Sequence, residues 1–121
     1  MDRELPSCSV ETTLKVIGGK WKVLILWYLR DEILRFGELR RAIPGVTQRV
    51  LTLQLRELEL DGIVARKVYA QVPPKVEYSI TELGRSLAPI LKLMCEWGTR
   101  HQQRMQPTLP QAGTTREKIA A

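Results

Sequence analysis

The stretch FGELRRAIPGVTQRVLTLQLREL, residues 36–58, contains two helical patterns separated by a short turn. Phe36, Leu39 and Ile43 recur at the spacing of one helix face, with acidic and basic residues between them. The Pro-Gly pair at 44–45 ends this first pattern, because both residues favour a turn over a continued helix. The stretch therefore begins with a short helix and a tight turn.

A second helix is expected directly after this turn. Thr47 is a good N-cap residue, and Leu51, Leu55 and Leu58 follow as one apolar stripe. The Asp-Gly pair at 61–62 ends the pattern. Two helices joined by a turn of a few residues predict a helix-turn-helix motif, in which the second helix enters the major groove of DNA.

The pattern downstream of this motif changes from helix to strand and back. Residues 64–72 and 75–80 are rich in β-formers, and the two prolines at 73–74 belong in the turn between them. Thr81 is the expected N-cap of one long final helix. Its apolar stripe comprises Leu83, Leu87, Ile90, Leu91, Met94 and Trp97.

Two further helices are expected upstream of the motif. Val10, Leu14 and Ile17 form one stripe, which stops at two glycines, 18–19, where a left-handed C-cap conformation is available. A second helix is expected over about residues 20–30. Its broad apolar face comprises Trp21, Leu24, Ile25, Tyr28 and Leu29.

The order of these elements defines the expected fold class. It is mainly α-helical with a small β-hairpin wing, the arrangement of a winged helix-turn-helix domain. A chain of 121 residues suffices for one modest core, and we assign residues 1–105 to that single domain. Residues 106–121 lack hydrophobic periodicity and are expected to be a flexible tail.

The net charge of +6 and the pI of about 9.7 favour a polyanionic partner or an anionic lipid surface. Residues 35–75 contain eight Lys and Arg against four acidic residues, so this segment contributes +4 of that total. The chain has neither a stretch apolar enough to span a bilayer nor an N-terminal signal pattern. We therefore expect a cytoplasmic protein that does not act at the membrane.

The residues that enzymes and metal sites need are scarce. His101 is the only histidine, and no nucleophile-base pair, carboxylate cluster or glycine-rich phosphate loop is visible. Cys8 and Cys95 are too far apart in sequence, and too few, to suggest a zinc ligand set or a disulfide framework. We predict a protein without enzymatic activity, structural metal or cofactor.

Double-stranded DNA is the partner that the motif and its charge favour. On the second helix, Arg49 suits guanine, Gln48 suits adenine and the Thr52 methyl group suits thymine, with Arg56 on the same face. The apolar Leu53 also lies there, with a role left open. The predicted phosphate contacts are Arg40, Arg41, the amides after Thr47, and Arg66, Lys67 and Lys75 of the wing.

The sequence resembles the HxlR-type family of bacterial winged-helix regulators, which are related in fold to MarR-type proteins. The resemblance spans about residues 8–97 and rests on a set of short motifs. These are Cys8, IGGKW at 17–21, FGELRR at 36–41, QRVLT at 48–52, LREL at 55–58, DGIV at 61–64, VPPKVEY at 72–78 and TELG at 81–84. Leu53 and Leu60 depart from the polar or small residues often found there, which puts the base preference in doubt.

The resemblance implies a homodimer on a pseudo-palindromic operator, with repression as the commoner activity. It also implies that the N-terminal and C-terminal helices form the dimer interface. The stripe after Thr81 supports this independently, because so small a domain has little core to cover it; the alternative is packing on its own domain. The expected interface residues are Val10, Leu14, Leu87, Ile90, Leu91, Met94 and Trp97.

Some members of this family sense oxidants or electrophiles through an N-terminal cysteine, which makes Cys8 a redox candidate. Its position just before a helix, with Lys15 on that helix, favours a thiolate. The alternative is that Cys8 packs as a small apolar residue, as we expect of Cys95. An oxidant or a small molecule is thus a further candidate partner. The rival function is a winged-helix module that binds protein and does not read DNA.

Overall fold

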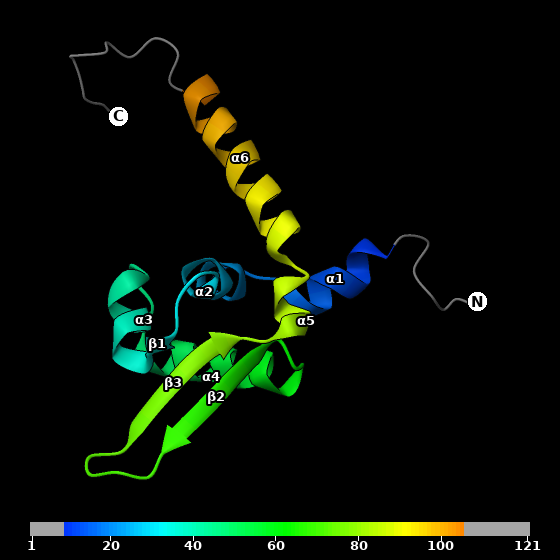
Figure 1. Cartoon of the computed structure of the whole chain (residues 1–121). Coiled ribbons are helices and arrows are strands. Elements are labelled where there is room, and N and C mark those ends of the chain that lie inside the picture. The colour runs from blue at the N-terminus through cyan, green and yellow to red at the C-terminus, as the bar shows by residue number, and fades with distance from the viewer. Residues whose placement is uncertain (1–8, 106–121) are drawn as a thin grey trace, which may run out of the picture. The chain divides into compact units, whose positions relative to one another are not determined.

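The helix-turn-helix stretch forms two helices, α3 and α4, in the computed structural model of the chain, which describes residues 9–105 (Figure 1). Leu39, Ile43 and Val46 of this stretch are buried. Gly45 in the turn has a φ of +81°, a conformation that favours glycine. The element bounds are α1 Val10–Ile17, α2 Trp21–Leu29, β1 Leu34–Arg35, α3 Phe36–Ala42, α4 Gln48–Leu60, β2 Val64–Tyr69, β3 Lys75–Ile80, α5 Glu82–Arg85 and α6 Ala88–Met105.

Helix α4 begins and packs as the sequence predicts. The Thr47 side chain accepts a hydrogen bond from the Val50 amide at 3.1 Å, which caps the helix. Leu51, Leu55 and Leu58 are buried at 0–2% exposure and form its inner face. These three leucines hold α4 against the core, so its opposite face is the one available to a partner.

Helix α2 is central to the core, and its apolar face was predicted only in part. Leu26, absent from the predicted face, is fully buried beside Ile25 and Leu29. Trp21, Leu24 and Tyr28 are only half-buried. The reason is that α2 packs against α3, α4 and β3, so it is covered on more sides than a single stripe serves. Its Lys22, with 10% of the side chain exposed, pairs with Glu57 of α4 at 2.6 Å.

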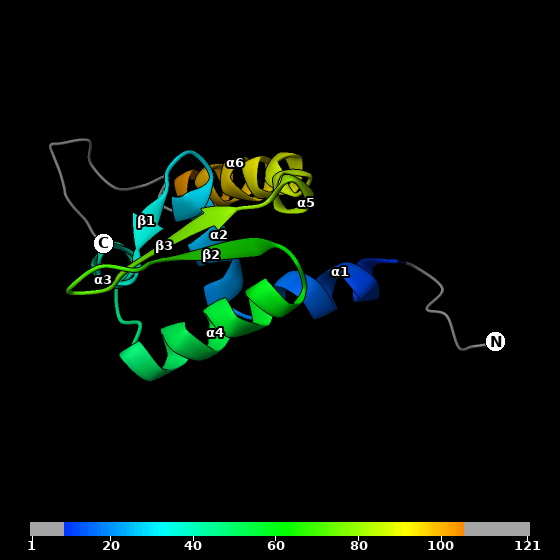
Figure 2. The same cartoon turned by 60° about the horizontal axis from the view of Figure 1, so that its bottom comes forward.

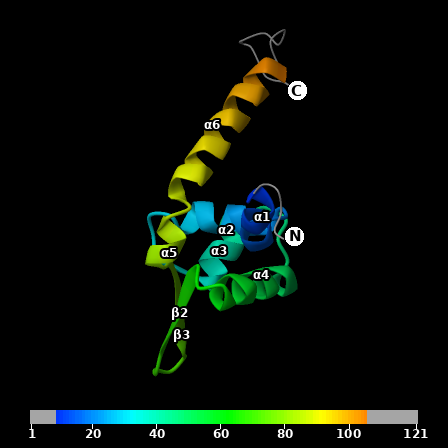
Figure 3. The ribbon, with the colours of Figure 1, turned by 90° about the vertical axis from the view of Figure 1, so that its right-hand side faces the viewer.

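The strands form a three-stranded antiparallel sheet in the order β1-β3-β2. In the hairpin, Val64 pairs with Ile80 and Tyr69 with Lys75. The second predicted strand has the observed bounds, whereas the first ends at Tyr69 and not at residue 72, because the turn between the strands begins earlier. The hairpin extends beyond the neighbouring helices (Figure 3).

Strand β1 was not predicted, because two residues are too short to show an alternating pattern. It pairs with β3, with Leu34 opposite Tyr78 and Arg35 opposite Glu77. Since β1 leads directly into α3, this pairing ties the start of the helix-turn-helix motif to the wing.

The single long helix predicted after Thr81 is in fact two helices, α5 and α6. Thr81 caps the short α5 by accepting a hydrogen bond from the Gly84 amide at 3.0 Å. Pro89 explains the break, because in a continuous helix its ring would clash with the carbonyl four residues earlier. Near the start of a new helix the same proline is tolerated.

The chain divides into two compact units between Ala88 and Pro89, and α6 is therefore described by itself. In the first unit, α1 ends at Gly18, and the next residue, Gly19, has a φ of +86°, in agreement with the expected left-handed glycine. The tail predicted over 106–121 lies outside the described residues. Over residues 9–105, no helix is both long and apolar enough to cross a membrane.

Candidate nucleic-acid interface

The outer face of α4 presents the side chains that the sequence assigned to base recognition. Arg49 and Arg56 are exposed on the side opposite the buried leucines, and Gln48 is exposed at the helix start, at the margin of that face. Leu53 lies among them and is 44% exposed, and Leu60 at the helix end is 80% exposed. Leu53 thus contributes an apolar contact to a face that is otherwise polar and basic.

The hydroxyl groups of two threonines, Thr52 of α4 and its N-cap Thr47, are engaged by the helix backbone. Thr52 is half-buried, and its Oγ1 donates to the Gln48 carbonyl at 2.8 Å. Its methyl group is therefore the part suited to a base, as the sequence suggested. The Thr47 oxygen caps the Val50 amide. Of the amides in the first turn, those of Gln48 and Arg49 are left for an anion.

The two arginines of α3 lie in its last turn, and both are exposed. There their charge complements the negative end of the helix dipole. The start of α3 is fixed by a hydrogen bond from the Arg35 amide to Glu38 Oε1 at 2.7 Å. Arg40 and Arg41 are thus held next to the turn before α4, where a phosphate contact would set its register.

The wing residues Arg66 and Lys67 point to opposite faces of the sheet, although the sequence analysis placed them in one set. Arg66 pairs with Tyr78, which is buried, and its Nε lies 3.5 Å from Glu59 Oε1 of α4. Lys67 pairs with Glu77 on the outer face. This follows from the two-residue alternation of a strand, which sends neighbouring side chains apart.

The outer face of the wing carries a cluster that the sequence analysis did not identify. The Tyr69 hydroxyl donates to Glu77 Oε1 at 2.9 Å, and Lys75 Nζ lies 3.3 Å from Glu77 Oε2. The hydrogen bond from Tyr69 is the largest cause of a lowered Glu77 pKa, with Lys75 and Arg35 acting in the same direction. The sequence shows only that Tyr69 and Glu77 each lie two residues from a predicted DNA contact, and the strand pairing is what brings them together.

The elements that carry the predicted contacts converge at one side of the first unit (Figure 2), although Arg66 and Lys67 point to opposite faces of the sheet. Figure 2 shows the N-terminal end of α4 and the tip of the hairpin projecting to the same side. The bases would be read by α4, and the backbone would be contacted by α3 and the wing. The arrangement of these elements matches what a winged helix-turn-helix protein needs for one DNA half-site.

The predicted dimer residues are largely exposed within the single chain. On α1, Val10 and Leu14 are 57% and 56% exposed. On α6, Trp97 is 62% and Met94 49% exposed, with Ile90 at 39%. Two members of the predicted set are covered within the chain, because Leu91 is buried and Leu87 is half-buried.

Leu93 is 63% exposed and belongs to the same face of α6, although the predicted stripe omitted it. It lies three residues after Ile90 and four before Trp97, the spacing of helix neighbours. It was missed because the stripe was extended backward through the break at Pro89 to Leu83 and Leu87, which are not on α6.

The two cysteines differ in what the structure describes. Cys8, the redox candidate, lies outside the described residues. Cys95 was expected to pack as a small apolar residue near the Met94 and Trp97 stripe, and within the single chain it is a free, exposed thiol on α6. Cys95 lies one turn after the buried Leu91 on the same helix face, but unlike Leu91 it is exposed. On the exposed side, the Trp97 ring stacks on His101 with centroids 4.8 Å apart.

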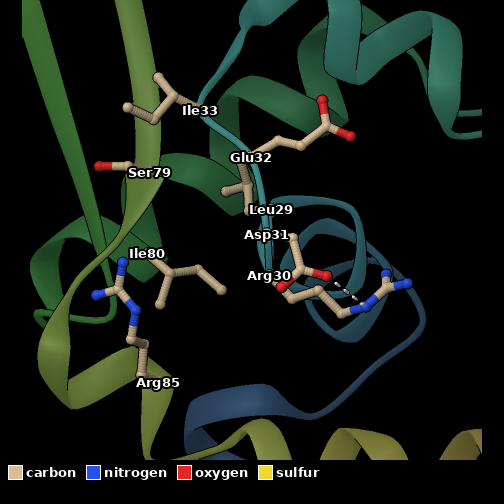
Figure 4. Close-up of a pocket in the computed structure, with 8 residues that line it drawn as sticks. All are labelled: Leu29, Arg30, Asp31, Glu32, Ile33, Ser79, Ile80 and Arg85. Atoms are coloured by element: carbon tan, nitrogen blue, oxygen red, sulfur yellow. Dashed lines mark ion pairs between the residues drawn. The ribbon is translucent and has the colours of Figure 1, made fainter.

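A hollow of about 330 Å³ lies beside the end of α2, between the residues that follow it and the junction of β3 with α5 (Figure 4). Its charged lining is balanced, with Arg30 and Arg85 against Asp31 and Glu32. The Arg30–Asp31 pair is 3.5 Å long. This balance does not favour a polyanion, so the basic outer face of α4 and the wing remain the candidate interface.

Known proteins with similar sequences and structures are regulators. A family model described as HxlR-like helix-turn-helix matches residues 16–106. The HTH-type transcriptional regulator YdeP of Bacillus subtilis (strain 168) is 55% identical over 102 residues, which are 84% of this chain and 80% of that protein. The regulator YybR of the same organism is 64% identical over 91 residues, 75% of this chain and 73% of YybR.

Solved structures show the same likeness. The redox regulator HypR in its reduced form has a TM-score of 0.78 and 57% identity, covering 83% of this chain and 99% of that one. Its oxidised form has a TM-score of 0.74 and 62% identity, covering 77% and 96%. These structures share the winged-helix fold of the present chain.

Proposed function

The chain belongs to the HxlR-like helix-turn-helix family, and from this premise we propose that it is a homodimeric transcriptional regulator that binds double-stranded DNA sequence-specifically. We further propose that it represses transcription from a pseudo-palindromic operator in the bacterial cytoplasm. The proposed role is regulatory and involves no catalysis, in line with its relatives, which are named transcriptional regulators.

One observation carries this proposal. The face of α4 with Gln48, Arg49 and Arg56 is exposed while the leucines behind it are fully buried. A helix held in this way presents a fixed set of hydrogen-bond donors to base edges. The exposed arginines of α3 and the lysines of the wing lie in the elements on either side of α4 in the sequence and support backbone contacts.

The homodimer is supported by the exposed apolar residues of α6 and α1. Isolated exposed leucines are common on proteins, but a row of Leu93, Met94 and Trp97 on one helix is typical of a contact surface. Two copies joined through these helices would present two α4 helices, which fits a site with two related halves.

DNA binding is tested by an electrophoretic mobility shift with genomic fragments over a salt series. We expect a sequence-specific shift that weakens steeply as salt rises, because Lys and Arg contacts release counterions. No shift at low salt would overturn the proposal and favour the rival function, a module that binds protein.

We also propose that oxidation at Cys8 controls DNA affinity by altering the dimer. The support is the 62% identity to a protein named a redox regulator and the position of Cys8 in the sequence. The test compares wild type, Cys8→Ser and Cys95→Ser with and without diamide. Wild type and Cys95→Ser should respond alike, while Cys8→Ser should not respond. An equal loss of affinity in all three proteins, or no loss in any, would end this proposal.

A further inference from the structure

The three-stranded sheet places three basic and two other side chains together on its outer face. Lys67 pairs with Glu77, and Tyr69 pairs with Lys75, across β2 and β3. On the other side of β3, Arg35 of β1 also pairs with Glu77. Because paired residues of antiparallel strands share a face, all five side chains lie on one side of the sheet. We call Arg35, Lys67, Tyr69, Lys75 and Glu77 the outer-face cluster.

The Tyr69 ring organises the two lysines of this cluster. Lys67 Nζ lies 4.9 Å and Lys75 Nζ 4.6 Å from the ring centroid, within the range of a cation–π contact. The Tyr69 hydroxyl donates to one oxygen of Glu77, and the other oxygen pairs with Lys75. One side chain therefore restrains both ammonium groups.

The net charge of the outer-face cluster favours an anionic ligand. Three cations and one carboxylate leave a net charge of +2 on a small area of strand. The side chains of Lys75 and Glu77 are 28% and 22% exposed, so both are partly covered, whereas Arg35 and Lys67 are exposed. A cationic face of this kind suits a phosphate anion.

We propose that the outer-face cluster is a preformed site for a phosphate of the DNA backbone, with Tyr69 and Glu77 as its positioning residues. Arg35, Lys67 and Lys75 contact the phosphate, and Tyr69 and Glu77 hold the two lysines before DNA arrives. This rests on the proposed DNA-binding function and adds three residues, Arg35, Tyr69 and Glu77, to that interface.

Positioning has a physical basis in side-chain entropy. A long, flexible lysine side chain loses much of its rotamer freedom when it is immobilised. Restraint in the free protein removes part of that cost from the binding step. Glu77 lies among three cations and offsets part of their positive charge. The site therefore attracts a free anion less strongly and depends on the rest of the interface to bring a DNA phosphate to it.

The test uses the full chain and an operator fragment selected from random DNA, titrated over a salt series. Tyr69→Leu should weaken binding about three- to tenfold, since the ordering cost of the lysines returns. Tyr69→Phe keeps the ring and should have a smaller effect. Both variants should keep the salt slope of wild type because no charge is lost, whereas Lys67→Gln should lower the slope by about one.

A double-mutant cycle separates positioning from a general effect on the wing. In a Lys67→Gln, Lys75→Gln background, Tyr69→Leu should cause no further loss of affinity. The same loss in both backgrounds, or unchanged affinity in Tyr69→Leu alone, would overturn the inference while DNA binding by wild type stands. If wild type itself fails to bind the selected DNA, the proposed function fails and the inference fails with it. Thermal melts followed by circular dichroism show that each variant is folded.

Discussion

Helices α4 and α6 are both amphipathic, but they use their apolar residues in opposite ways. The large apolar residues on the inner face of α4, including Leu51 and Leu55, are at most 2% exposed. On α6, Leu93 and Trp97 are more than 60% exposed. The difference shows which face of each helix is left without a contact inside the chain. The apolar face of α4 is covered within the chain and its polar face is exposed, as the proposed DNA contact requires, whereas α6 retains an exposed apolar face, as the proposed dimer requires.

The largest expected effect comes from truncating a buried leucine of α4. Leu55→Ala should lower the free energy of unfolding by about 2–5 kcal/mol, because it opens a cavity beneath the helix. The matched change on α6, Leu93→Ala, should cost less than about 0.5 kcal/mol in the dissociated protein, as for other surface substitutions. Urea unfolding at low protein concentration measures both. Equal losses of unfolding free energy in the two variants would contradict the difference between the two helices.

The next effect concerns self-association. Trp97→Ala should raise the dimer dissociation constant at least about tenfold, since exposed tryptophans are the commonest anchors of interfaces. Sedimentation velocity over a concentration series provides the measurement. Leu60→Ala, which changes an 80% exposed leucine of α4, serves as the control and should leave the constant unchanged. A monomeric wild type would refute the assignment of α6.

A smaller effect is expected in DNA recognition. Arg49→Ala should cost about 1–3 kcal/mol of specific binding and relax the preference at one base pair. The equivalent change on α6, Arg100→Ala, should alter specific binding little. Fluorescence anisotropy with operator and scrambled duplexes at fixed salt distinguishes these outcomes. If both arginines contribute equally, α4 is not the reading helix.

The smallest expected effect concerns the N-cap of α4. Thr47→Ala should lower the free energy of unfolding by about 1 kcal/mol, because the Val50 amide loses its cap. Thr47→Ser should retain most of that stability, since its hydroxyl can accept the same hydrogen bond. Chemical denaturation of the two variants side by side tests this, and identical losses would argue against the cap.

Local patterns predicted the elements whose signals are local. The N-cap at Thr47, the leucine stripe of α4 and the bounds of β3 were all predicted from a few neighbouring residues. The two-residue strand β1 was missed, and a single helix was predicted where Pro89 divides α5 from α6. A strand of two residues is too short to show an alternating pattern. The break between α5 and α6 would have been predicted only if Pro89 had been given more weight than the apolar stripe that continues past it.

The candidate interface also contains residues that local patterns predict and residues that they do not. The sequence predicted which helix presents Gln48 and Arg49, because the position of a residue on a helix follows from its spacing to the buried leucines. It grouped Arg66 with Lys67, although strand alternation separates them. Tyr69 and Glu77 were missed because their importance depends on the partner strand.

The residues along the chain were enough to predict the helix-turn-helix motif, the family and the basic character of the candidate interface, since composition, spacing and capping are properties of neighbouring residues. Only the tertiary structure decided which side chains meet across strands and helices, such as Lys22 with Glu57 and Tyr69 with both wing lysines. The physical reason is that strand register and helix packing bring together residues far apart in the chain, and these contacts follow from the whole fold and not from any local pattern.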